Sequence, residues 1–339
     1  RLKMAGAKAL FCSDLTYRKG KELALKGIAD DALNEHVEAV PSVVVLRRSE
    51  VEPAMREGRD IYWPEFLARG KGMSDEVEWL ESNEPAYILA TFGTTAAPKL
   101  AVHTHGGYQV HIHAMGDWVF GLKENDVWWS TSDIGWVVGH SYIVYAPLLA
   151  GCTTVAFEGA IDHPSPETFY RIIETNAVTG IFTAPTAVRM LMKYGVAPAQ
   201  NHELGSLTRV FSAGEVLNAP AWEWLQREVF GNRIPVLDHM WQTETGGPIF
   251  GNPWGLGMLA IKPGSGGIAL PGIDAAVGSP EGEELGANEK GMMVRCGLCA
   301  GSSGGLGGDA PGDQPALRRI RGGRTARRRY PATYAPVGQ

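Results

Sequence analysis

Residues 180–212 read GIFTAPTAVRMLMKYGVAPAQNHELGSLTRVFS, and this stretch decides the fold. Its two ends, 180–183 and 209–212, are short runs rich in β-branched and aromatic residues, which is typical of buried strands. Between them, residues 184–194 have the apolar spacing of a helix. A strand, a helix and a second strand at this spacing predict a parallel βαβ unit.

The same alternation continues on both sides of this stretch. Further strands are predicted at 86–90, 127–130, 153–157 and 235–238, and further helices near 106–120, 139–149, 165–176 and 218–230. Near the start of the chain, a buried strand is predicted at 9–12, a helix at 22–38 and a strand at 43–46. We therefore expect an α/β protein with layered, mostly parallel sheets and flanking helices.

Three regions follow from composition. Residues 1–246 form the α/β core, whose first βαβ unit reads as cut off at its start, and residues 50–83 read as a connecting surface segment within it. Residues 247–294 are rich in Gly and Pro and predict a small β-rich subdomain. Residues 295–339 contain eight arginines, no lysine and no hydrophobic periodicity. Out-of-frame translation and a disordered basic tail both explain this composition, and we favour the first.

The composition of the whole chain excludes several classes of protein. A net charge of -6 over 339 residues provides no general basic field for nucleic acid. No run of 18 or more apolar residues is present, so we expect no membrane span. Four cysteines are too few for a disulfide scaffold and fit a reducing compartment, so we expect a cytoplasmic protein.

Four polar loops each follow a predicted strand, at 91–99, 132–141, 212–216 and 238–246. Loops after parallel strands meet at one edge of a sheet, where α/β proteins bind ligands. The first loop offers Thr hydroxyls and Lys99 to phosphate, and the last offers Glu244 to Mg²⁺ and Trp241 to close a small pocket. Each loop alone could be an ordinary turn, but together the four are expected to converge on one edge of the sheet as a ligand site.

These residues resemble those of the AMP-forming acyl-CoA synthetases, within the adenylate-forming superfamily. The likeness covers about residues 8–294 and is most specific at WQTETG (241–246), at 132–147, at TAPT (183–186) and at ESNEP (81–85). It is strongest to members that act on acetate, with propionate-specific members as near neighbours. The resemblance implies that a carboxylate attacks the α-phosphate of Mg-ATP, and that the thiol of coenzyme A then displaces AMP from the acyl-adenylate.

The resemblance also implies the roles of individual residues. Catalytic roles fall to Lys99, Thr243 and Glu244, with Glu244 as the Mg²⁺ ligand. The residues implied to bind ATP or AMP are Thr91, Gly93, Thr94, Thr95, Gly214, Glu215, Val216, Asp238, His239, Met240, Trp241, Gln242 and Thr243. The implied acyl pocket consists of Val137, Val138, Ala213 and Trp241, and the implied contacts to coenzyme A are Val138 and Asp162.

The chain departs from the family pattern in two places. In the phosphate loop, Phe92 stands where a Ser is usual and Ala97 where a Lys is usual, which removes a hydroxyl and a positive charge. We therefore predict weakened use of ATP. In the tail, the ribose-binding Thr-Gly-Asp motif, the Gly-Arg-x-Asp-Asp hinge and the mobile C-terminal domain of the family are missing. We therefore expect an incomplete synthetase that is weakly active or inactive, or a non-catalytic nucleotide-binding remnant.

Two further patterns could indicate metal. His103 and His105, like His111 and His113, are pairs without an acidic or Cys partner at a suitable spacing. Cys296 and Cys299 lack a second pair. We expect none of these to be a metal site.

Overall fold

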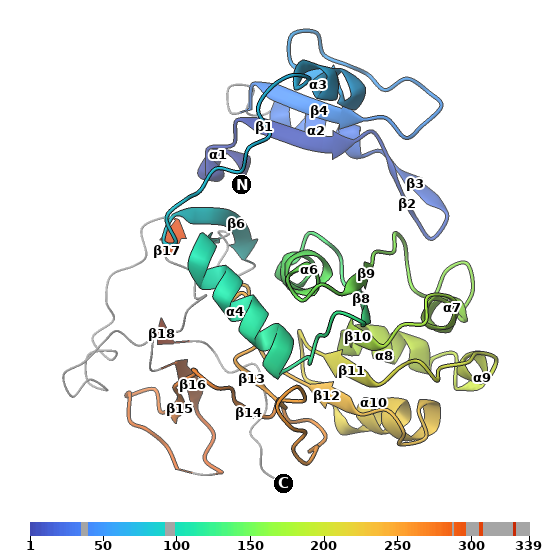
Figure 1. Ribbon diagram of the computed structural model, residues 1–339, viewed down its shortest axis with the longest axis vertical. Helices are drawn as coiled ribbons and strands as arrows, with labels where there is room; N and C mark the ends of the chain where they lie inside the picture. Colours follow the sequence, from blue (N-terminus) through green and yellow to red (C-terminus); the bar gives the residue numbers. More distant parts are fainter. Residues whose placement is uncertain (35–39, 92–98, 287, 296–304, 308–327, 330–339) are drawn as a thin grey trace.

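The structure, a computed structural model, describes residues 1–34, 40–91, 99–286, 288–295, 305–307 and 328–329. Its central feature is a five-stranded sheet in the order β12-β11-β10-β8-β9, with every neighbouring pair parallel (Figure 1). The strands are β8 (Val127–Ser130), β9 (Thr153–Val155), β10 (Gly180–Thr183), β11 (Arg209–Ser212) and β12 (Val236–Asp238). The predicted α/β class and the predicted positions of these strands are confirmed.

Helices cover both faces of this sheet because adjacent strand residues point to opposite sides. Trp129 and Ile181 pack into a core with α7 (Thr168–Thr175), α8 (Pro185–Met192), α10 (Ala219–Glu223) and the π-helix η2 (Trp224–Val229). Trp128 and Phe182 pack into a second core with α4 (His105–Trp118), the π-helix η1 (His140–Tyr145) and α6 (Ala146–Leu149). Both cores are rich in aromatic residues. Because they lie on opposite faces of the sheet, the strands between them are buried on both sides.

Two further short helices lie in this part of the chain. They are α5 (Val137–Gly139), which leads directly into η1, and α9 (Ala197–Gln200).

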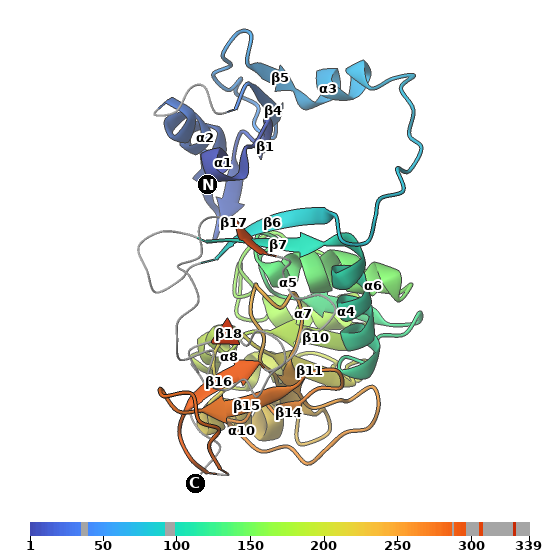
Figure 2. The same ribbon diagram turned by 90° about the vertical axis from the view of Figure 1, so that its left-hand side faces the viewer.

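The region before residue 70 forms a separate small unit. Its parallel sheet, in the order β1-β4-β5, consists of β1 (Ala9–Ser13), β4 (Ser42–Leu46) and β5 (Asp60–Tyr62). The helices of this unit are α1 (Leu2–Ala5), α2 (Leu25–Asn34) and α3 (Trp63–Arg69). It also contains a hairpin of β2 (Thr16–Arg18) and β3 (Lys21–Leu23). Figure 2 shows an extended segment joining it to the rest. The βαβ prediction is confirmed here, but β1 is not buried, since Phe11 is 54% exposed. β5 and α3 were missed within 50–83.

Three small antiparallel arrangements complete the chain. β6 (Pro85–Thr91) pairs with β7 (Lys99–Thr104), and β17 (Gly305–Gly307) pairs with the other edge of β7. β13 (Phe250–Gly251) pairs with β14 (Ile268–Ala269), and β15 (Ala275–Gly278) pairs with β16 (Met292–Arg295), which also pairs with β18 (Arg328–Arg329). The composition of 295–339 did not predict β17 or β18. Within the described residues, no helix is both long and apolar enough to span a bilayer.

Candidate functional site

Three of the four predicted loops leave the same edge of the five-stranded sheet. Hydrogen bonds continue the strand ladder past the strand ends, from the backbone N–H of Thr131, Ala213 and His239 to carbonyl groups of β10 and β11, at 2.9, 3.3 and 3.0 Å. The loops after β8, β11 and β12 are therefore neighbours. Their convergence at the carboxyl ends of parallel strands is confirmed.

The fourth loop is placed differently from the prediction. β6 belongs to an antiparallel hairpin and not to the parallel sheet, because Lys99–Thr104 forms a second strand that pairs back onto it. The hairpin pairs Thr91 with Lys99, so these two residues flank the phosphate loop on either side. Gly93, Thr94 and Thr95, like Phe92 and Ala97, lie outside the described residues.

One buried histidine links this hairpin to the loop after β12. His103 is 0% exposed, and its Nε2 lies 2.8 Å from the carbonyl oxygen of Thr243. Because a carbonyl oxygen only accepts, Nε2 carries the proton in this contact. The ring also stacks on Tyr87 of β6, with centroids 4.7 Å apart. His103 therefore holds the strand of Lys99 against the loop that carries Thr243 and Glu244.

Two consecutive glycines bring the loop after β12 close to helices α4 and η1. A side chain at Gly246, whose φ is +73°, would lie 3.1 Å from Tyr108 and 3.2 Å from His103. A side chain at Gly247 would lie 2.9 Å from both His111 and the hydroxyl of Tyr142. Only glycine therefore fits without displacing a neighbour.

The hydroxyl of Ser141 stabilises the close packing of this loop against α4 and η1. It donates to the carbonyl of Gly246 at 2.6 Å and lies 2.7 Å from the hydroxyl of Tyr108. Ser141 lies in the predicted loop 132–141 but was given no role of its own, Tyr108 was not predicted, and His103 was considered only as part of a possible metal pair. The WQTETGG run could have indicated close packing through its glycine pair.

Three of the four predicted acyl-pocket residues belong to one hydrophobic cluster. Val137 and Ala213 are buried at 8% and 5% exposure, and Val138 and Trp241 pack against the same core as Ala213. They come from α5 and from the loops after β11 and β12. Trp241 is half-buried, so part of its surface lies outside the core.

Asp238 and His239 are buried side by side at the end of β12. One carboxylate oxygen of Asp238 accepts the backbone N–H of Leu217 at 3.1 Å, and burial raises the pKa of Asp238 to about 7. His239 lies against the rings of Phe120, Phe182 and Phe211, and burial lowers its pKa to about 3. Met240 is also buried, whereas Gln242 and Thr243 are half-buried. Direct nucleotide contact by the side chains of His239 and Met240 stays a prediction that this burial does not favour.

Glu215 is tied to helix α8. Its carboxylate accepts the hydroxyl of Thr186 and lies 2.6 Å from Arg189. The hydrogen bond from Thr186, followed by that from Arg189, lowers the pKa of Glu215. Gly214 has a φ of +106° and leaves open space where a side chain would stand. The turn 214–216 thus combines a fixed acid with an open backbone, which suits the approach of a planar base.

Asp162 lies far along the chain from these loops and is held by the β2–β3 hairpin. Lys19 contacts its carboxylate at 2.7 Å, and the hydroxyl of Tyr194 donates to it at 3.0 Å. Burial is the largest single effect and raises the pKa of Asp162, but the hydrogen bonds from Lys19 and Tyr194 and the charge of Lys19 together outweigh it, so the pKa is lowered. Asp162 is thus already paired within the chain.

Glu244 and Lys99 are the two other charged residues predicted for the site. Among the described residues, neither Glu244 nor Lys99 forms an ion pair. Glu244 is half-buried and Lys99 is exposed. Mg²⁺ is commonly bound through one or two carboxylates together with substrate phosphates and water. A single accessible carboxylate such as Glu244 fits that pattern.

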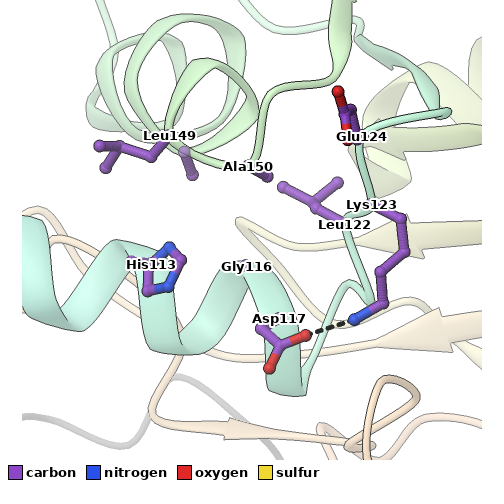
Figure 3. A pocket seen from close by; sticks show the side chains of 9 residues that line it. His113, Gly116, Asp117, Leu122, Lys123, Glu124, Leu149 and Ala150 are labelled. Atoms are coloured by element: carbon purple, nitrogen blue, oxygen red, sulfur yellow. Dashed lines mark hydrogen bonds and ion pairs between the residues drawn. The ribbon is translucent and has the colours of Figure 1, made fainter.

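A pocket of about 350 Å³ lies between α4, the segment 122–124 and α6 (Figure 3). The side chains of Leu122 and Leu149 line it together with the ion pair of Asp117 and Lys123, at 2.6 Å, and with His113. No residue of the predicted nucleotide, acyl or metal sites is among its lining residues. The predicted site is therefore distinct from this pocket.

Comparison with known proteins agrees with this geometry. The family model described as AMP-binding enzyme matches residues 1–299. An acetyl-coenzyme A synthetase of Rubrobacter xylanophilus is 46% identical over 294 residues, which is 87% of this chain and 45% of that protein. A 3-hydroxypropionyl-coenzyme A synthetase of Sulfurisphaera tokodaii is 42% identical over 298 residues, with the same coverage of each. The chain spans about half the length of the curated relatives it matches.

A solved structure supports the fold. The anthranilate CoA ligase in complex with anthranoyl-AMP superposes with a TM-score of 0.74, at 21% identity, over 90% of this chain and 53% of that one. The loops that converge on the parallel sheet, the match across residues 1–299 and the identity to acetyl-coenzyme A synthetases all lead to one conclusion. The chain belongs to the AMP-binding enzyme family.

Proposed function

We propose that this chain is the nucleotide- and acyl-binding part of a synthetase that activates acetate to acetyl-coenzyme A. The observation that carries the proposal is that Val138, Ala213 and Trp241 pack against one hydrophobic core, with Trp241 on the same loop as Thr243 and Glu244. Together with Val137, these residues would hold a very short acyl group against a nucleotide. The identity of 46% to an acetyl-coenzyme A synthetase supports acetate as the acid.

In the first step, a carboxylate oxygen of acetate attacks the α-phosphorus of ATP. The bond from that phosphorus to the oxygen bridging it to the β-phosphate breaks, and pyrophosphate leaves. Glu244 would hold Mg²⁺, and Lys99 and Thr243 would contact the phosphates. These groups provide alignment and charge neutralisation, which carry most of the catalysis in such displacements.

In the second step, the thiol of coenzyme A attacks the acyl carbon. The bond between that carbon and the phosphate oxygen breaks, the thiol proton is lost and AMP leaves. Val138 and Asp162 are proposed to lie on the side where coenzyme A enters. Because Asp162 is paired with Lys19, a role for it would be exerted through the β2–β3 hairpin.

A three-carbon acid such as propionate is the second candidate. The 42% identity to a 3-hydroxypropionyl-coenzyme A synthetase favours it. One methylene changes binding by only about 1–3 kcal/mol in an apolar pocket, so the same residues could accept either acid.

Equilibrium binding of alkyl esters of AMP tests the proposal, since these esters resemble acyl-adenylates and need no second domain for turnover. Isothermal titration calorimetry should show the ethyl ester binding to the 339-residue chain more tightly than AMP. An ethyl ester that binds no better than AMP would argue against an acyl pocket beside the nucleotide.

A further inference from the structure

The ring of Trp241 is the part of the proposed acyl pocket whose position depends on other side chains. It stands on the loop between β12 and β13 and is only half-buried, whereas Val137 and Ala213 are buried. A large ring on a loop narrows a pocket only when its neighbours hold it in place. The residues behind it therefore bear on the acids that the site admits.

Two aromatic side chains contact the Trp241 ring from the core. Tyr142 of η1 meets it nearly at right angles, with centroids 5.5 Å apart and an interplanar angle of 78°. Phe182 of β10 lies 5.9 Å from it at 47°. Both are fully buried, at 0% and 2% exposure. Edge-to-face contacts of this kind stabilise one ring orientation beyond the effect of buried area alone.

Tyr142 and Phe182 are themselves fixed by a shared neighbour. Phe120 packs against Tyr142 at 4.5 Å and against Phe182 at 5.7 Å. Tyr142 is further held in place because the backbone carbonyl it carries accepts the indole N–H of Trp128 at 2.8 Å. The backing of Trp241 is thus a rigid aromatic layer and not a set of mobile side chains.

We propose that Tyr142 and Phe182 are positioning residues that set the depth of the acyl pocket by holding the indole ring of Trp241. This inference rests on the proposed function, because it concerns the length of acid that the same site accepts. If the backing is reduced, the ring moves toward the core and the pocket deepens. Longer acyl groups then bind with less penalty, while contacts to the nucleotide are unchanged.

The chain offers a matched control in Phe211. It lies directly opposite Phe182 in the register of β10 and β11, it is fully buried, and it packs against both Phe120 and His239 as Phe182 does. Among the described contacts, only Phe182 of the two reaches Trp241. Phe182→Leu and Phe211→Leu therefore remove the same ring from equivalent core positions, and differ in the loss of the tryptophan contact.

The test measures Kd for the ethyl, propyl, butyl and pentyl esters of AMP with the 339-residue chain. In the wild type, each carbon beyond the pocket limit should weaken binding by about 10- to 200-fold. In Phe182→Leu, the ratio of Kd values between the longest ester that the wild type binds well and the next longer one should fall by at least tenfold. In Phe211→Leu it should stay as in the wild type, even though thermal stability falls similarly.

Tyr142 provides a second variant if Phe182→Leu does not fold. Tyr142→Leu should also shorten the step, whereas Tyr142→Phe, which keeps the ring, should retain the wild-type order of Kd values. The inference would be overturned if the Kd step changed equally in Phe182→Leu and Phe211→Leu. It would also be overturned if the series of Kd values were unchanged in both Phe182→Leu and Tyr142→Leu. Either result would leave the proposed function standing. A wild-type chain that binds none of the esters would overturn the proposed function and this inference with it.

Discussion

The contact between His103 and Thr243 gives the sharpest prediction about how the site is assembled. His103→Phe keeps a ring that can stack on Tyr87 but removes the N–H that reaches the carbonyl of Thr243 at 2.8 Å. An unsatisfied buried acceptor costs about 1–3 kcal/mol. Thr243 is only half-buried, so we expect the lower part of that range, about 1–2 kcal/mol.

This cost should appear in ligand binding as well as in stability, because the lost contact joins the strand of Lys99 to the loop of Glu244. A change of 1–2 kcal/mol corresponds to a factor of about 5–30 in an equilibrium constant. We therefore expect the ethyl ester of AMP to bind about 5- to 30-fold more weakly to His103→Phe, as measured by calorimetry. His113→Phe, the same substitution on the exposed side of α4, should leave Kd unchanged.

Urea unfolding separates the two roles of His103. If His103→Phe lowers the free energy of unfolding while the ester binds with wild-type Kd, the histidine supports the fold only. The contact between the strand of Lys99 and the loop of Glu244 would then have no effect on ligand binding, contrary to this prediction.

Three other perturbations have definite expected results. Asp126→Ala leaves the 5% exposed side chain of Arg209 without the carboxylate at 2.7 Å, so urea unfolding should show a loss of about 3–5 kcal/mol; a loss below about 1 kcal/mol would contradict this. The pKa of Asp238 is raised to about 7 in the folded chain, so its folded form binds more protons than its unfolded form between about pH 4 and pH 7, and stability falls as pH rises through that range. Asp238→Asn should flatten this fall in thermal melts, and an unchanged slope would count against it. Phe92→Ser combined with Ala97→Lys, placed in a full-length synthetase, should increase pyrophosphate release, and no gain would show that these residues do not limit ATP use.

The sequence predicted the central sheet well because its strands carry a strong local signal. Val127–Ser130, Gly180–Thr183 and Arg209–Ser212 are short apolar runs between helical segments, and the structure places each as a strand with those bounds. Strands that are buried on both faces are nearly continuous apolar runs, so they can be predicted from sequence without knowing which strand they pair with. The loops that follow them could therefore be located before the fold was known.

The hairpin β6–β7 could not be predicted in the same way. Its second strand begins at Lys99, directly after the phosphate loop, and local pattern does not state whether a following strand pairs back or crosses over. The exposure of Phe11 in β1 likewise depends on what packs against that sheet, which is a tertiary property.

The side chains behind the site were also beyond local pattern. Tyr142 and Phe182 lie 99 and 59 residues before Trp241, and their contacts with it exist only once η1 and β10 are packed together. His103 and Thr243 are 140 residues apart in sequence. Resemblance to a family identified the residues that would face the ligand, but the residues that hold them emerged from the packing.

We propose that Trp241 limits this site to adenylates of very short acids. The most direct test compares Kd for the butyl and ethyl esters of AMP in the wild type and in Trp241→Gly. We predict that the ethyl ester binds more tightly in the wild type and that the order reverses in Trp241→Gly, because removing the indole ring opens apolar volume. If the wild type already binds the butyl ester more tightly, or if Trp241→Gly still binds the ethyl ester more tightly, then Trp241 does not limit the length of the acyl group.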